Sequence, residues 1–188
     1  MGFFAGFASG FCVQFALMAG VTYLPRLLQE GLGMPAASSG AVLIPMTLAL
    51  MVGSNSSGAV FRATGRLRAI VAVSSLVLLA AATFAAMSPV LAVASSAAIA
   101  AALGLGVGVG MPVSNLVAQA GAEPADAGRA TSVAMLFRGF GGTVSTAACG
   151  MLAPTVTAAG TFSVFGAVCV AALARLVASR FIPREIAS

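Results

Sequence analysis

The chain has 188 residues, of which 60% are hydrophobic and 7% charged, and its mean hydropathy is +1.09. A soluble domain carries about 25% charged residues, so this composition excludes a water-soluble fold. The net charge of +5 comes from arginines scattered along apolar runs, which excludes a continuous basic surface for nucleic acid. Histidine is absent and no acidic residue lies within an apolar run. We therefore expect no enzyme, no cofactor and no metal site.

Six apolar runs are each long enough to cross a bilayer as a helix, which takes about 20 residues. The first run ends at Pro25, and the last run ends two residues before Pro183. The sequence therefore predicts an all-α integral membrane protein, a single six-helix transmembrane bundle over residues 1–188. In chain order the predicted spans cover residues 3–25, 36–61, 67–86, 90–119, 126–153 and 159–181.

The charged loop residues predict how the bundle is oriented. Arginine excess marks the cytoplasmic side of a membrane. Three of the six flanking regions, the second-to-third loop, the fourth-to-fifth loop and the C-terminal tail, carry most of the charges, whereas the other connections hold only Arg26 and Glu30. We therefore expect a multi-pass protein of the cell membrane with both termini in the cytoplasm. The charges on the predicted cytoplasmic side are Arg62, Arg66, Arg68, Glu123, Asp126, Arg129, Arg175, Arg180 and Arg184.

The polar residues predict which spans are central. The third and sixth spans are almost purely apolar, whereas the other four contain amides, one arginine and most of the glycine and proline. Polar side chains at membrane depth usually face the bundle interior or a wet cavity. We therefore expect the first, second, fourth and fifth spans to be central and the other two peripheral.

The fourth span contains glycine at every second position, followed by a proline. Gly104 and Gly108 share one helical face, whereas Gly106 and Gly110 share roughly the opposite face. Such small residues let neighbouring helices approach closely, and Pro112 can kink the helix. The pattern fits a bundle that rocks and also fits static close packing.

Three segments carry a resemblance to a known family. They are YLPRLLQEGLGMPAASSGAVLIP at 23–45, GAVFRATGRLR at 58–68, and GLGVGVGMPVSN followed by AGRATSVAMLFRGFGGTVSTAACG at 127–150. Their order and spacing resemble helices seven to eleven of major facilitator superfamily transporters, closest to the drug/proton antiporter branch with fourteen spans. The resemblance runs over nearly the whole chain.

The segment at 58–68 is similar to the cytoplasmic loop signature of that superfamily, glycine-x-x-x-Asp-Arg-x-Gly-Arg-Arg. Gly58, Gly65 and Arg66 match it. Arg62 stands where the signature has Asp, so the carboxylate contact of this loop is lost, and Arg68 adds a further positive charge.

The resemblance implies that the chain is the C-terminal six-helix half of a secondary transporter. Family members bind substrate between two halves and expel lipophilic, often cationic drugs against proton entry. The implied partners are the lipid bilayer, a small lipophilic substrate, and a missing N-terminal half of six to eight helices or a second copy. The family's proton-carrying acids lie mostly in the other half. The alternatives are a truncated, non-transporting membrane protein and a half-transporter that serves as an assembly partner.

Arg138 is the sharpest single candidate for a site residue. It lies about 18 Å into the fifth span, near mid-membrane, where a charge costs at least about 2.5 kcal/mol. That cost favours contact with a substrate, an anion or a gate, although a purely structural partner remains open. Phe137 and Phe140 flank it and could line the same cavity.

Gln14 lies midway along the first span between Phe11 and Phe15. One polar group among aromatic rings suits a broad apolar pocket, and an interhelical hydrogen bond suits it equally. Asn55 in the second span and Asn115 in the fourth are weaker cavity candidates, for which interhelical bonding is the better reading.

The two charged cytoplasmic loops have opposite character. Arg62, Arg66 and Arg68 lie in one, and Glu123 and Asp126 in the other. Asp126 also lies at a helix start, where the helix dipole stabilises a carboxylate. We therefore expect an ionic latch between the loops, whereas a simple positive-inside bias would explain the arginines but not the acids.

Overall fold

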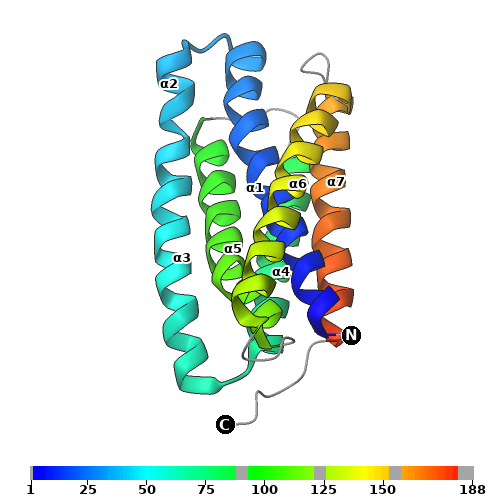
Figure 1. The fold of residues 1–188 in the computed structure, drawn as a ribbon. Coiled ribbons are helices and arrows are strands. Elements are labelled where there is room, and N and C mark those ends of the chain that lie inside the picture. Colours follow the sequence, from blue (N-terminus) through cyan, green and yellow to red (C-terminus); the bar gives the residue numbers. More distant parts are fainter. Residues whose placement is uncertain (1, 88–92, 121–125, 153–157, 182–188) are drawn as a thin grey trace.

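The computed structural model describes residues 2–87, 93–120, 126–152 and 158–181, which are almost entirely helical and pack into one bundle (Figure 1). No strand occurs in these ranges. The prediction of an all-α membrane bundle of six spans is confirmed at the level of fold. The elements are α1 (Gly2–Leu32), α2 (Ala36–Ala41), α3 (Leu43–Thr64), α4 (Leu67–Met87), α5 (Val93–Ala120), α6 (Ala127–Leu152), α7 (Ala158–Ala178) and the short 3₁₀ helix η2 (Ser179–Phe181).

Five helical stretches of the described chain are long and apolar enough to cross a membrane. They correspond to the first four predicted spans and the sixth. The helix of the fifth predicted span, α6, is less apolar and is not among the five, because it contains Arg129, Arg138 and several glycines. The five stretches are Gly6–Leu32, Ala36–Ala63, Leu67–Met87, Ser95–Gln119 and Gly160–Ala178.

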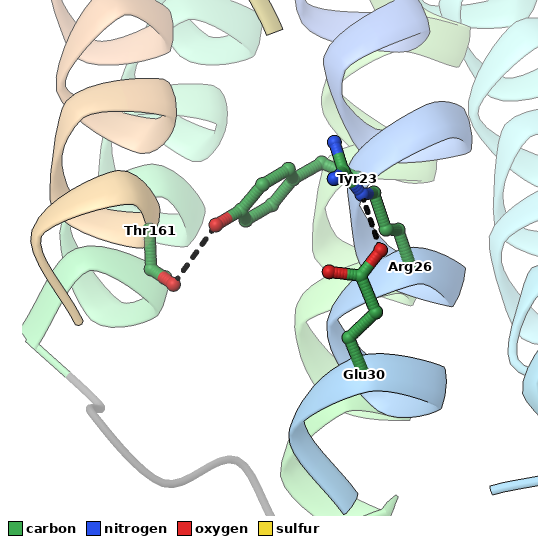
Figure 2. A network of polar contacts seen from close by, with 4 residues as sticks. All are labelled: Tyr23, Arg26, Glu30 and Thr161. Atoms are coloured by element: carbon green, nitrogen blue, oxygen red, sulfur yellow. Dashed lines mark hydrogen bonds and ion pairs between the residues drawn. The ribbon is translucent and has the colours of Figure 1, made fainter. Parts of the chain in front are cut away.

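The helix α1 continues beyond Pro25 to Leu32, although the sequence predicts that the first span ends at that proline. Proline removes one backbone hydrogen bond, and membrane helices tolerate this loss when neighbouring contacts compensate. Here Arg26 Nε donates to Glu30 Oε1 at 2.7 Å, one turn further along α1. On the other side of α1 the Tyr23 hydroxyl lies 3.1 Å from Thr161 Oγ1 of α7, within hydrogen-bond distance (Figure 2).

The second predicted span is broken into α2 and α3 at Val42. Pro45 lies in the first turn of α3, where a missing N–H costs little because those N–H groups have no intrahelical partner. At its other end α3 stops at Gly65, which has a φ of +64° and donates its N–H to the Phe61 carbonyl at 2.8 Å. Only glycine adopts this left-handed conformation without strain, so the loop glycine ends the helix.

The centre of the bundle is formed by α1 and α5 (Figure 1). The helix α3 packs mainly on α5 and α6 mainly on α1, while α4 and α7 pack on each other and on the central pair. As a result α3 and α6 leave much of their apolar surface exposed, so the expected grouping of four central spans is not the one seen within this chain. Exposed apolar side chains of these two helices include Leu48, Met51, Val52, Met135, Leu136, Phe140 and Met151.

Candidate functional site

Arg138 of α6 points toward the two central helices. Its Nη2 lies 3.3 Å from the Sδ of Met111 on α5, a weak acceptor. Its Cγ lies 3.1 Å from the position that a Cβ on Gly10 of α1 would occupy. The guanidinium is therefore half-buried, packed across a glycine on one helix and a thioether on the other. This arrangement leaves most of its donors available to another group.

Arg175 of α7 approaches the same two helices from the other side and is fully buried. Its Nε donates to Ser9 Oγ at 2.8 Å. Its Nη1 and Nη2 have no hydrogen-bond partner in the described part of the chain. A Cβ on Gly110 would lie 2.9 and 2.8 Å from these two nitrogens, so the guanidinium occupies the space that the glycine leaves open.

The two arginines lie at the same level of the bundle. Arg138 contacts Gly10 and Met111, while Arg175 contacts Ser9 and Gly110, the adjacent residue on each central helix. The contact between α1 and α5 is thus flanked by a cation on each side. A buried charge without a counter-charge is costly, so the pair favours an anionic group at this level.

The chain itself offers almost no carboxylate to these arginines. It contains four acidic residues. Glu30 pairs with Arg26, Asp126 pairs with Arg129 at 3.1 Å, and the remaining two, Glu123 and Glu185, lie outside the described residues. Within the described ranges, neither Arg138 nor Arg175 has an ion-pair partner.

Two amide oxygens between α1, α5 and α6 are also left without partners. Gln14 Oε1 and Asn115 Oδ1 are buried and accept no hydrogen bond from the described residues. The Gln14 Nε2 lies 3.7 Å from the position of a Cβ on Gly142 of α6. Buried acceptors are nearly always satisfied by protein or water, so these oxygens can receive a donor from a bound molecule or a solvent molecule. Gln14 lies one helical turn from Gly10, and Asn115 lies one turn from Met111, the two residues that Arg138 contacts, so we treat these three polar residues as one group.

The aromatic candidates do not gather around Arg138. Phe15 belongs to the main core, and its carbonyl accepts the Ser145 hydroxyl at 2.7 Å. Phe137 stacks on Phe7 with ring centroids 5.2 Å apart. Phe140 is 65% exposed and lines a shallow hollow on the surface of α6. Arg138 does not line this hollow.

The remaining candidates have local roles in the structure. Phe11 brings its backbone against Gly141 of α6. Asn55 is exposed on α3 and donates from Nδ2 to the Met51 carbonyl of its own helix at 3.0 Å. Asn55 therefore satisfies a donor within its own helix.

The glycines of α5 separate into two kinds of contact. Gly104 and Gly108 lie directly against the backbone carbonyls of Met46 and Leu50 on α3. Gly106 lies against the Leu78 side chain of α4, and Gly110 against Arg175 of α7. The helix also contains Pro112 within its continuous run.

The turn between α3 and α4 and the start of α6 lie at the same end of the bundle (Figure 1). Asp126 pairs with Arg129 of its own segment, and the described residues include no ion pair between the two loops. Arg62 and Arg66 are exposed and Arg68 is half-buried, while Gly58 has no neighbouring atom where its Cβ would lie. Glu123 and Arg184 lie outside the described residues.

Sequence reasoning missed Arg175 as a buried residue, because its position near the end of the last span made it resemble a flanking cytoplasmic charge. A signal was present in the spacing. Arg175 comes before three more apolar residues and Ser179, so it lies inside an apolar run rather than after it.

The family model of the Major Facilitator Superfamily matches residues 1–146. The chain belongs to the major facilitator superfamily. No curated protein matches it. Among solved structures it is similar to the inward-open xylose transporter XylE from E. coli, with a TM-score of 0.80 and 14% sequence identity.

The match to XylE covers 97% of this chain and 48% of that one, so the chain spans about half of its structural neighbour. At this identity the likeness shows the fold alone. The chain is therefore a multi-pass membrane protein with the fold of one transporter half. Its family is one of transporters rather than enzymes.

Proposed function

We propose that the chain is the C-terminal half of a proton-coupled secondary transporter that expels lipophilic drugs or metabolites by alternating access. The fourteen-span drug/proton antiporter branch is supported by the segments at 23–45, 58–68 and 127–150. The missing N-terminal half, or a second copy, would pack on the exposed apolar faces of α3 and α6 and supply the proton-carrying acids, which the spans of this chain lack.

The observation that carries the proposal is the polar group on the inner side of α6. Arg138 supplies one cation, and Gln14 and Asn115 each supply a buried acceptor without a partner among the described residues. Ligand pockets of this kind are mostly apolar with a few polar anchors. The anchor charge is positive, so we infer that the substrates are neutral or anionic lipophilic molecules rather than cations.

Transport by everted vesicles tests this proposal. The vesicles come from cells that express the full-length gene product, and the probes are anionic carboxyfluorescein and cationic ethidium. We expect proton-driven uptake of carboxyfluorescein, and an Arg138→Gln variant should reduce it about ten-fold or more, as the loss of a hydrogen-bonded charge in a dry site predicts. The control is Arg129→Gln, which changes an exposed loop arginine.

Three results would contradict the proposal. Uptake of both probes without dependence on the proton gradient would contradict the proposed proton coupling. Ethidium transport that exceeds carboxyfluorescein transport would contradict the inferred preference for neutral or anionic substrates. Equal losses in Arg138→Gln and Arg129→Gln would show that Arg138 has no specific role in substrate binding.

A non-transporting half that serves as an assembly partner is the second candidate, and the lack of an acidic residue inside the apolar runs, which a proton relay would need, favours it. A C-terminal tag at the native locus separates the two candidates. A band on a denaturing gel more than twice the 18.4 kDa of this chain supports a complete transporter. A band near 18.4 kDa supports the separate half.

A further inference from the structure

A groove on the far side of the bundle from α6 lies between α3 and α4, with α5 as its floor. Its volume is about 340 Å³, within the usual range of about 300–1,000 Å³ for ligand sites. It is separate from the group formed by Gln14, Asn115 and Arg138. The groove is lined by Ser56, Ser57, Val60, Arg66, Ala69, Ile70, Val73 and Val109.

The groove has one charged end and one apolar end. Arg66 lies in the turn between α3 and α4, and the lining continues through Ala69 and Ile70 to Val73, on one face of α4. From Arg66 to Val73 the helix rises about 10 Å into the apolar span. Val109 of α5 closes the floor. A phospholipid has the same polarity, with a charged headgroup at the membrane edge and a chain that extends inward.

The charge at the open end is positive and unopposed. The Arg66 side chain is exposed and has no carboxylate partner in the described ranges. Arg62 and Arg68 add two further positive charges nearby in the sequence, and the first turn of α4 contains no acidic residue. Basic clusters beside membrane helices attract anionic headgroups.

The two serine hydroxyls of the groove donate to backbone carbonyls of their own helix. Ser56 donates to the Val52 carbonyl at 2.7 Å, and Ser57 donates to the Ser54 carbonyl at 2.8 Å. Both oxygens keep lone pairs, so they can accept from the glycerol hydroxyls of a headgroup but do not compete with Arg66 for its phosphate.

We propose that this groove binds one anionic phospholipid, with the phosphate at Arg66 and an acyl chain over Ile70, Val73 and Val109. The full-length protein in detergent is titrated with dioleoylphosphatidylglycerol or dioleoylphosphatidylcholine, and bound lipids are counted by native mass spectrometry. We expect one tightly held phosphatidylglycerol and weaker binding of phosphatidylcholine. Arg66→Gln should weaken phosphatidylglycerol binding about five-fold, and Arg66→Lys should restore most of it.

Two further variants separate the site from general attraction to a basic surface. Arg180→Gln removes an exposed arginine in η2, outside the groove, and should leave binding unchanged. Val73→Trp fills the apolar end at a position that is 57% exposed, so it should fold normally and weaken binding of the acyl chain. Circular dichroism checks that each variant is folded.

Several outcomes would overturn the proposal. Equal losses in Arg66→Gln and Arg180→Gln would indicate general electrostatic attraction. Displacement of the lipid by excess inorganic phosphate, with no effect of Val73→Trp, would indicate a phosphate site without a lipid chain. Absence of any bound phosphatidylglycerol in the full-length protein would indicate that the other half of the transporter covers the groove.

Discussion

Arg175 is the most costly side chain in the described structure. It is fully buried between α1, α5 and α7, and only its Nε has a partner, the Ser9 hydroxyl. Replacing buried ionic groups by apolar residues of similar size is often neutral or stabilising, because the desolvation penalty disappears. The absence of a side chain at Gly110 leaves space for the guanidinium between α1 and α5.

We expect Arg175→Met to leave the unfolding temperature in detergent unchanged or to raise it, by about 2–4 °C for each kcal/mol of desolvation penalty removed. Ser9→Ala should instead lower it, because the remaining Arg175 Nε would then also lack an acceptor, at a cost of about 1–3 kcal/mol. Thermal unfolding followed by circular dichroism measures both. A fall for Arg175→Met larger than that for Ser9→Ala would show that the guanidinium has a partner beyond the described residues.

The two intramembrane arginines differ in how readily the sequence reveals them. Arg138 lies in the middle of its span, and its depth alone marks it as a candidate. Arg175 lies near the end of its span, where arginine is usually a flanking charge, and its burial depends on the packing of α1 and α5 around it. A one-dimensional pattern gives depth along a helix but not the neighbours on each face.

The glycines of α5 decide how closely the central helix approaches its neighbours. Gly104 and Gly108 place the backbone of α5 against carbonyls of α3, and no side chain fits between them. Gly106 and Gly110 accommodate a leucine of α4 and an arginine of α7. One helix therefore meets three partners at different distances, which uniform apolar packing would not give.

The variant Gly108→Ala should destabilise the bundle by about 1–3 kcal/mol, because its Cβ would overlap the Leu50 carbonyl and α3 would have to move outward. The matched control is Gly166→Ala in α7, where no atom lies within 4 Å of the new Cβ. The control should stabilise the helix by about 0.5–1 kcal/mol. Thermal unfolding in one detergent compares them, and similar effects of the two changes would contradict the close packing of α3 on α5.

The helix positions were largely predictable, because hydropathy and length determine where a chain crosses a membrane. The third predicted span, 67–86, matches α4 (Leu67–Met87), and the sixth, 159–181, matches α7 and η2. The helix ends near proline residues were harder to predict from the sequence. The helix α1 continues past Pro25 with support from an ion pair, whereas near Pro45 the helical stretch Ala36–Ala63 is divided into α2 and α3 at Val42, and residue type alone does not distinguish these two outcomes.

At the scale of the whole molecule, α1 and α5 are covered by the other helices, whereas α3, α4, α6 and α7 all expose large apolar side chains. The chain spans about half of XylE, in which a second half lies beside the first. The sequence predicted the half-size correctly from the order of its motifs, but the exposure of α3 and α6 required the three-dimensional packing.

The proposed ionic latch also belongs to this scale. In this structure Asp126 pairs with Arg129, so a latch between Asp126 and Arg62, Arg66 or Arg68 would need Asp126 to change partner, and Glu123 lies outside the described residues. We expect Asp126→Asn to change the transport rate in vesicles and to make it less sensitive to salt, since exposed ion pairs are screened. Arg129→Gln is the control. Equal effects would assign the change to the local pair, and no effect in either variant would remove the latch.

The arginine pair around the α1–α5 contact has one more consequence, for the integrity of the membrane. Two fixed positive charges at one level repel small cations, as an arginine does in water-selective pores that exclude protons. Any water that enters between α1, α5 and α6 would therefore conduct protons and sodium poorly past Arg138, and the buried charge of Arg175 behind the α1–α5 contact adds to the repulsion. Vesicles that contain an Arg138→Gln, Arg175→Met double variant should lose an imposed pH gradient faster than the wild type. The same two residues that favour a bound anion would also limit the leak of cations across the bilayer.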